Sequence, residues 1–495
     1  MGLAGEGRDM SRGRGARLGG VIGALALAAG GARAETLADA IALAYGSNPT
    51  LQGQRATQRA LDETYVQAEA GYRPTASVQA TITTDSNNQQ SSRRLPGQNN
   101  NVPSGQSQTS SVALTLTQPL YTGGRVASQV SAAEAGVLAG RELLRATEEN
   151  VLQGVVQAYA DVRRDQESVA IAQEDVTLLG RQLEESRARF EVGEITRTDV
   201  AQTEARVAAA QAQLSAAQAR LADSRAAYAA VVGRNPGDLA PEPSLARFLP
   251  ATVDLAFAAA ERDNPQIRQS DYAEQASAAR VAAAKAQTRP SVALQASLGY
   301  AGGSLGVASP FANYSHDLSA TAVATFPLFT GGLTSSQIRQ AAENNNVDRI
   351  AIEATRRQVL LSVSRAWNQL LGARASLVAN LEQVRAANIA FEGTRQEAQV
   401  GLRTTLDVLI TEQDLGNAEL ALVTARHDEY VAASALLAAT GSLFAQDLTT
   451  VAAPYDPKAN FDRVRHAWGW TPWAPAVSAL DHLAAPGIVK LPPPH

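Results

Sequence analysis

The chain has 495 residues and no cysteine. This absence excludes disulfide bonds, thiolate metal sites and an acylated N-terminal cysteine. A basic surface is also missing, because the net charge is −5 and the isoelectric point is about 5.7. Nucleic-acid binding, which needs a positive field, is therefore excluded. Beyond residue 34 no apolar run approaches the roughly 18 residues of a membrane-spanning helix, so any membrane crossing would have to use strands.

Signatures of catalysis are missing as well. No Walker, G-x-S-x-G or H-E-x-x-H motif occurs, and no two histidines stand at metal-ligand spacing. The five histidines are His316, His427, His466, His482 and His495. We expect His316 in an exposed loop and His427 on a solvated helix face. The sequence predicts no enzyme, no cofactor and no metal site.

Residues 1–34 have the pattern of a signal peptide. Arginines precede an apolar run from Leu18 to Ala29, and Ala32 to Ala34 form an A-x-A cleavage site. Met10 offers an alternative start, and the exported protein is expected to begin at Glu35. Export without disulfides is typical of a bacterial envelope protein.

The rest of the chain is a tandem duplication. Asn48-Pro49 recurs 216 residues later as Asn264-Pro265, and the segment from Pro119 to Gly124 recurs 208 residues later as Pro327 to Gly332. The offset decreases from 216 to 208 residues between these two landmarks. The second copy must therefore have a shorter loop there. We expect a first repeat at 35–242, a second at 243–448, and a tail at 449–495.

Each repeat contains two segments that alternate between apolar and small polar residues. The first repeat has them near 76–83 and 112–117, and the second has them near 292–298 and 318–326. A period of two predicts strands, and an apolar face opposite a polar face favours an outer-membrane β-barrel over a soluble antiparallel sheet. Four strands cannot close a barrel, so several copies would have to share one. Two copies would give a filled barrel, and three would give a lumen.

Long helical hairpins follow each pair of strands. Apolar residues recur every seven positions from Val155 to Phe190 and again from Val363 to Phe391. This heptad spacing predicts coiled-coil packing, and a helix from Gly124 to Val192 would reach about 100 Å. The chain is expected to reverse at Gly193 and Gly401 into a second heptad stripe. The predicted fold is mainly α, with one β-hairpin in each half.

The motifs together resemble the TolC family of outer-membrane efflux and secretion ducts. The resemblance rests on Asn-Pro in the first helix of each half, on Pro-Leu-aromatic-Thr-Gly-Gly after each β-hairpin, and on V-G-x-x-T-x-x-D-V at Val192 to Val200 and Val400 to Val408. It covers nearly the whole exported chain. The segment from Gly401 to Leu409 looks most similar to the branch that serves type I protein secretion.

The resemblance implies a homotrimer in the outer membrane, with a 12-stranded barrel and a periplasmic tunnel of 12 helices. It also implies two partners, a periplasmic adaptor (membrane fusion protein) and an inner-membrane transporter, with passive conduction of protein or drug cargo. From the residues alone, a soluble periplasmic coiled-coil scaffold or adaptor-like protein is the alternative.

Functional residues are expected at the two helical turns. The resemblance implies that Arg403 binds carboxylates such as Asp199 across neighbouring hairpins and holds the tip closed, and that Asp407 belongs to an acidic ring. Adaptor docking is expected at the turns themselves, at Gly193, Thr196, Gly401 and Thr404. Helix capping by Asp199 and Asp407 is the simpler interpretation of the two acids.

Two positions depart from the family pattern, and they predict a weaker gate. Ala398 stands where the best-known family member has a tyrosine, and Ile410 stands at its second acidic ring. In the tail, Trp468, Trp470 and Trp473 could pack around the middle of the tunnel, and its proline-rich end is expected to be disordered.

Overall fold

The computed structural model describes residues 34–86, 106–305, 314–449, 455–466 and 473–484. Within them the chain forms two successive halves with the same order of elements. The first half consists of α1 (Leu37–Ser47), α2 (Pro49–Glu69), β1 (Thr75–Ser86), β2 (Gln106–Tyr121), α3 (Arg125–Glu191) and α4 (Arg197–Val232). The second half consists of α5 (Val253–Asp263), α6 (Pro265–Ala286), β3 (Ser291–Leu305), β4 (Ser315–Thr325), α7 (Leu333–Gln399) and α8 (Thr405–Thr440).

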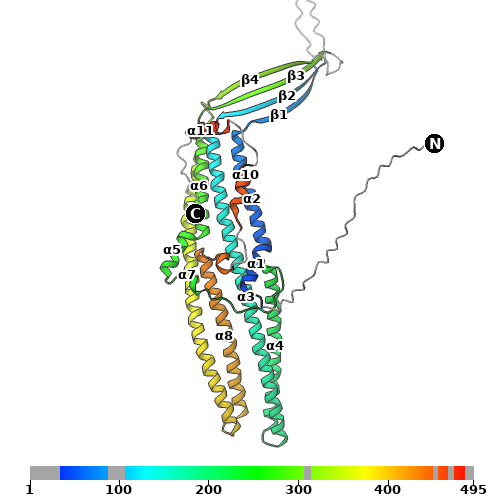
Figure 1. Cartoon of the computed structure of the whole chain (residues 1–495), viewed down its shortest axis with the longest axis vertical. Coiled ribbons are helices and arrows are strands. Elements are labelled where there is room, and N and C mark those ends of the chain that lie inside the picture. The colour runs from blue at the N-terminus through cyan, green and yellow to red at the C-terminus, as the bar shows by residue number, and fades with distance from the viewer. Residues whose placement is uncertain (1–33, 87–105, 306–313, 450–454, 467–472, 485–495) are drawn as a thin grey trace, which may run out of the picture.

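The two halves match in length as well as in order. Helices α3 and α7 have 67 residues each, and α4 and α8 have 36 each. The long helices lie side by side in an elongated bundle, the sheet projects from one end, and the α3–α4 and α7–α8 turns lie at the other end (Figure 1). The predicted long helix from 124 to 192 is confirmed as Arg125–Glu191. None of the helices in the described ranges is at once long and apolar enough to cross a bilayer.

Each asparagine-proline pair joins a helix start to the end of a distant helix. The Asn48 side chain accepts hydrogen bonds from backbone N–H groups in the first turn of α2, and its Nδ2 donates to the carbonyl of Val231 in α4 at 3.0 Å. Asn264 repeats both roles for α6, donating to Ala439 in α8 at 2.9 Å. Proline suits the first helical position because its missing N–H would have no partner there. The motif therefore fixes the short helices to the base of each hairpin.

The four strands form one antiparallel sheet in the order β1-β2-β3-β4. The strand register places residues of similar polarity next to one another across all four strands. One face carries an apolar row of Val78, Leu114, Leu298 and Leu318. The opposite face carries a hydroxyl row of Ser77, Thr115, Ser297 and Ser319. The predicted alternation is confirmed. His316 is exposed as expected, but it lies in β4 rather than in a loop.

The main core lies in the middle of the bundle, where α1 and α5 pack against the long helices. Tyr159 and Tyr228 are completely buried there. The Tyr159 hydroxyl lies 2.9 Å from the carbonyl oxygen of Glu35 and 2.6 Å from that of Ala240. The Tyr228 hydroxyl donates to the Glu35 carboxylate at 2.9 Å. These contacts fix the start of the first half and the connection between the halves to the same level of the bundle.

The tail adds helices that run along the bundle toward the sheet. After α9 (Ala445–Leu448), α10 (Pro457–Arg465) lies beside α2, and α11 (Ala474–Ala484) lies near the base of the sheet (Figure 1). Trp473 Nε1 donates to Gln118 Oε1 in β2 at 3.0 Å. Trp473 therefore lies at the sheet end and not around the middle of the tunnel as expected. Trp468 and Trp470 fall outside the described residues, as does the signal segment 1–33.

Asp481 of α11 joins the tail to the start of α3. Its carboxylate is fully buried and accepts hydrogen bonds from the backbone N–H groups of Thr122, Gly124 and Ala127 at 2.9, 2.9 and 3.2 Å. The Thr122 hydroxyl also donates to it at 2.8 Å. Burial opposes ionisation, but the hydrogen bonds from Gly124 and Thr122 outweigh burial and lower the pKa of Asp481. A tail residue thus caps the helix that leaves the sheet.

We expect Asp481→Ala to lower the thermal unfolding temperature of the purified protein in detergent. The change leaves three N–H groups without an acceptor, which costs about 2–4 kcal/mol. Because the pKa of Asp481 is lowered from 3.8, its contribution persists at neutral pH and is lost only under strong acid. Asp462→Ala, which removes an exposed aspartate of α10, is the matched control. Equal unfolding temperatures for the two variants would contradict the capping role.

Candidate functional site

The two helical turns share one backbone design. Gly193 and Gly401 have φ angles of 78° and 79°. In both turns the N–H of the next residue donates to the carbonyl five residues earlier at 2.9 Å. This is the Schellman arrangement, whose left-handed position favours glycine. The predicted reversals are confirmed, and both glycines are exposed.

The helices that leave the turns begin with capping boxes. The Thr196 N–H donates to Asp199 Oδ2 at 2.9 Å, and the Asp199 N–H donates to the Thr196 hydroxyl at 3.4 Å. Thr404 and Asp407 repeat the pair at 3.0 and 3.2 Å. These bonds lower the pKa of both aspartates, so both are ionised at neutral pH. The capping interpretation is confirmed, and the two threonines and aspartates serve turn geometry whatever else they do.

The two turns carry ion pairs of opposite polarity. At the first turn, Arg189 on the helix end contacts Glu194 in the turn at 3.1 Å. At the second turn, Glu397 on the helix end contacts Arg403 in the turn at 2.9 Å. Glu397 stands 208 residues after Arg189, so the repeat reverses the charge on the helix end. This reversal was not among the features expected from the sequence, although it is visible when the two copies are aligned at their common offset of 208 residues.

Arg403 contacts a carboxylate of its own hairpin in the single chain. Its partner is Glu397, whereas Asp199 is engaged with Thr196. Both side chains of the Arg403 pair are about half exposed. The pairing of Arg403 with Asp199 across neighbouring hairpins stays a prediction about assembled copies.

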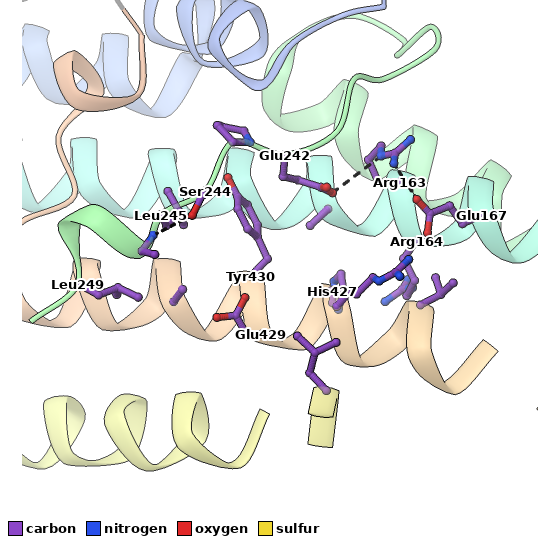
Figure 2. A pocket seen from close by; sticks show the side chains of 17 residues that line it. Arg163, Arg164, Glu167, Glu242, Ser244, Leu245, Leu249, His427, Glu429 and Tyr430 are labelled. Atoms are coloured by element: carbon purple, nitrogen blue, oxygen red, sulfur yellow. Dashed lines mark hydrogen bonds and ion pairs between the residues drawn. The ribbon is translucent and has the colours of Figure 1, made fainter. Parts of the chain in front are cut away.

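A pocket of about 330 Å³ opens between α3, α8 and the connection between the halves. Figure 2 shows Arg164 of α3 beside His427 of α8, Arg163 of α3 beside Glu242 of the connection, and Tyr430 of α8 near Ser244. Arg163 lies 4.0 Å from the Glu242 carboxylate. Within the described part of the chain, no group of three or more His, Asp or Glu side chains is arranged to hold a metal ion.

The expected solvated position of His427 is wrong. Its side chain is only 10% exposed, because α3 packs over it. Its Nε2 lies 2.9 Å from the Asp161 carboxylate of α3, and its Nδ1 lies 2.9 Å from that of Asp428. The sequence could not show this, since the contact depends on how the two hairpins pack.

Duplicated helical hairpins with capped turns at one end and a four-stranded sheet at the other define a class of duct-forming outer-membrane proteins. The chain matches the family model described as outer membrane efflux protein over residues 40–234 and 257–442. The chain therefore belongs to the outer membrane efflux protein family.

Known relatives agree with this assignment. Outer membrane efflux protein BepC of Brucella suis biovar 1 is 36% identical over 437 residues, which cover 88% of this chain and 92% of that protein. Alkaline protease secretion protein AprF of Pseudomonas aeruginosa is 28% identical, covering 69% of this chain and 72% of its own.

Solved structures support the fold. The crystal structure of CusC matches 82% of this chain and 92% of its own with a TM-score of 0.69 at 18% identity. That of VceC from Vibrio cholerae matches 82% and 96% with a TM-score of 0.67 at 23% identity. Family membership makes this chain an outer-membrane exit duct and excludes the soluble scaffold alternative. The family consists of channel proteins rather than enzymes.

Proposed function

We propose that three copies of this chain share one 12-stranded barrel and one tunnel of 12 helices. The observation that carries the proposal is the sheet itself. Strands β1 and β4 end it on either side, and the side chains of β1 are exposed throughout. Lipid cannot satisfy open strand edges, so β1 and β4 need strands from other copies. Three copies are the smallest assembly of this sheet that leaves a lumen.

The helical part supports the same assembly. Along α7, large apolar side chains remain exposed in the single chain, with 63% of Val347, 71% of Ile350, 63% of Val378 and 63% of Ile389 accessible. A soluble surface rarely carries so long an apolar stripe. We infer that this face packs against the neighbouring copy and closes the tunnel wall.

The duct would conduct passively, joined at its turns to a periplasmic adaptor and through it to an inner-membrane transporter. The turn residues Gly193, Thr196, Gly401 and Thr404 are exposed at the end of the bundle farthest from the sheet (Figure 1). We propose exported protein as the main cargo. Similarity to an efflux protein favours small toxic compounds as a second cargo.

Leu318→Arg is expected to block outer-membrane insertion. Leu318 is 77% exposed and ends the apolar row, which would face lipid in the barrel. A basic side chain on that face costs about 2–4 kcal/mol at the membrane centre. Thr321→Arg, on the opposite face of the same strand, should insert normally because it would face the lumen. Membrane fractionation and native electrophoresis measure the outcome. Soluble, monomeric wild-type protein would refute the duct, and equal insertion of both variants would refute the assigned faces.

Arg403→Ser is expected to raise single-channel conductance severalfold in planar bilayers. Asp199→Ala should do the same, and the double variant should add little, because both changes remove the same contact between neighbouring hairpins. Arg189→Ser is the control for losing an arginine at a turn. Asp407→Asn should leave the tip closed but weaken block by divalent cations, since a ring of carboxylates binds cations. Unchanged conductance in both the Arg403 and the Asp199 variants would leave these residues as turn electrostatics.

Gly401→Trp is expected to abolish transport while the trimer stays inserted. The substituted residue would obstruct an exposed docking turn, and it would also strain a left-handed backbone position. Gly401→Asn separates obstruction from backbone strain, because asparagine is smaller than tryptophan and tolerates the left-handed conformation. Three quantities are measured in each variant: the yield of crosslinks to the adaptor, the amount of secreted protein and the sensitivity of the cells to drugs. Normal crosslinking in the tryptophan variant would refute docking. If the tryptophan variant makes cells sensitive to drugs but leaves protein secretion unchanged, small toxic compounds would be the main cargo and exported protein the second.

A further inference from the structure

The two long hairpins of one chain meet where α3 packs along α8, and we call this contact the seam. The seam begins at the main core, and a small apolar cluster near the turns buries Leu179, Ala210 and Leu409, with Val176 and Val207 packed against them. Below this cluster the α3–α4 and α7–α8 turns lie apart (Figure 1). The seam is therefore the contact that must loosen if one hairpin moves relative to the other.

His427 occupies the upper part of the seam. Each of its ring nitrogens lies 2.9 Å from a carboxylate oxygen, one from Asp161 of α3 and one from Asp428 of α8. The Nδ1 contact with Asp428 is a hydrogen bond, whereas the Nε2 contact with Asp161 has ion-pair distance without hydrogen-bond geometry. An imidazolium carries an N–H on both nitrogens and is attracted to both carboxylates, whereas a neutral imidazole would turn one lone pair toward a carboxylate. Arg164 also faces the site, and it binds Asp161 at 2.9 Å. The packed seam thus favours the charged histidine.

Glu412 of α8 occupies the lower part of the seam. It is 5% exposed, and its Oε1 has no hydrogen-bond partner among the described residues. Asp175 of α3 lines the same small pocket and lies over Gly416, where an added Cβ would come within 3.1 Å of its Oδ2. Two carboxyl groups from the two hairpins therefore converge in a space that glycine keeps open.

Nearby positive charges oppose the rise in the pKa of Glu412 without cancelling it. Arg206 of α4 donates its hydrogen bond to Gln413, but its charge still favours ionised Glu412, as does that of Arg395 from α7. Glu174 of α3 and Glu419 of α8 add further negative charge. Burial and Asp175 raise the pKa of Glu412 to about 7. The packed seam thus favours a protonated Glu412.

We propose that the seam is a proton-dependent latch, which holds the two hairpins together in acid and loosens as the pH rises through neutrality. The latch rests on the proposed opening of the tip, and it adds proton release as a regulator of that opening. Protonated His427 attracts the carboxylates of both hairpins. Protonated Glu412 does not repel Asp175. Both groups act in the same direction.

The sign follows from linkage. Burial lowers the pKa of His427, but its contacts with the Asp161 and Asp428 carboxylates outweigh burial and raise that pKa above 6.5 in the packed seam. Its contribution is complete below 6.5 and is lost as the pH rises through the raised value. The pKa of Glu412 rises from 4.5 to about 7, so the seam weakens across that interval. Each proton released on opening lowers the closed-to-open ratio by up to about tenfold per pH unit.

Spin labels can follow the separation of the hairpins directly. The chain has no cysteine, so Glu194→Cys and Leu402→Cys place labels only at the two turns. In full-length protein in lipid nanodiscs, we expect the distances between labels to lengthen between about pH 5 and about pH 8.5. Glu412→Gln, which mimics the protonated acid, should shift the lengthening to higher pH. His427→Gln should shift it to lower pH, and His466→Gln in the tail is the control.

Two outcomes would overturn the latch. Distances that do not change with pH in the wild type refute it, as do identical pH profiles in the wild type and in the Glu412→Gln and His427→Gln variants. The label distances do not depend on conduction. A pH-dependent separation with constant conductance would therefore support the latch and contradict the proposed tip gate instead.

Discussion

Backbone hydrogen bonding in lipid is the constraint on which the rest of this structure depends. The sheet has four strands, and β1 and β4 each present one edge that pairs with no other strand of the described residues. Such edges are acceptable in a membrane only when other strands complete them. In the assembly that we propose, a closed barrel brings several copies into one ring, and the long helices that start at the sheet follow the same ring. The proposed helical tunnel is in this sense a consequence of the sheet.

Duplication would set the geometry of the proposed ring, and the positions where the two copies differ would set the charges at its turns. Helices of equal length place all turns at one level. The turns differ in the arrangement of charge. One has Arg189 on the helix end and Glu194 in the turn, and the other has Glu397 on the helix end and Arg403 in the turn. Hairpins that alternate around a ring would therefore meet a neighbour of opposite pattern. Equal charges at every turn would repel instead.

Local features of this fold could be predicted from the sequence, whereas contacts between distant segments could not. The chain reversal at Gly193 and the helix start after Thr404 follow from turn and capping chemistry within a few residues, and the predicted reversal holds. The Asn48-Pro49 pair, expected inside one helix, instead separates α1 from α2. The partner of Arg403 and the burial of His427 depend on side-chain packing between helices. The role of Asp481 has no trace in the repeat, because the tail has no counterpart in the first half. The sequence therefore predicted the order of elements and the location of the turns, but not the ion pairs that the turns form within the chain.

The cap that Asp481 places on α3 also has a consequence for the order of folding. The N–H groups it binds belong to residues near position 122, while the carboxylate arrives about 360 residues later. During export from the N-terminus, the first hairpin and the first two strands emerge long before this acceptor does. Their junction stays incomplete until α11 has followed. The sheet-to-helix corner therefore reaches its full set of hydrogen bonds only after both halves of the chain have been exported.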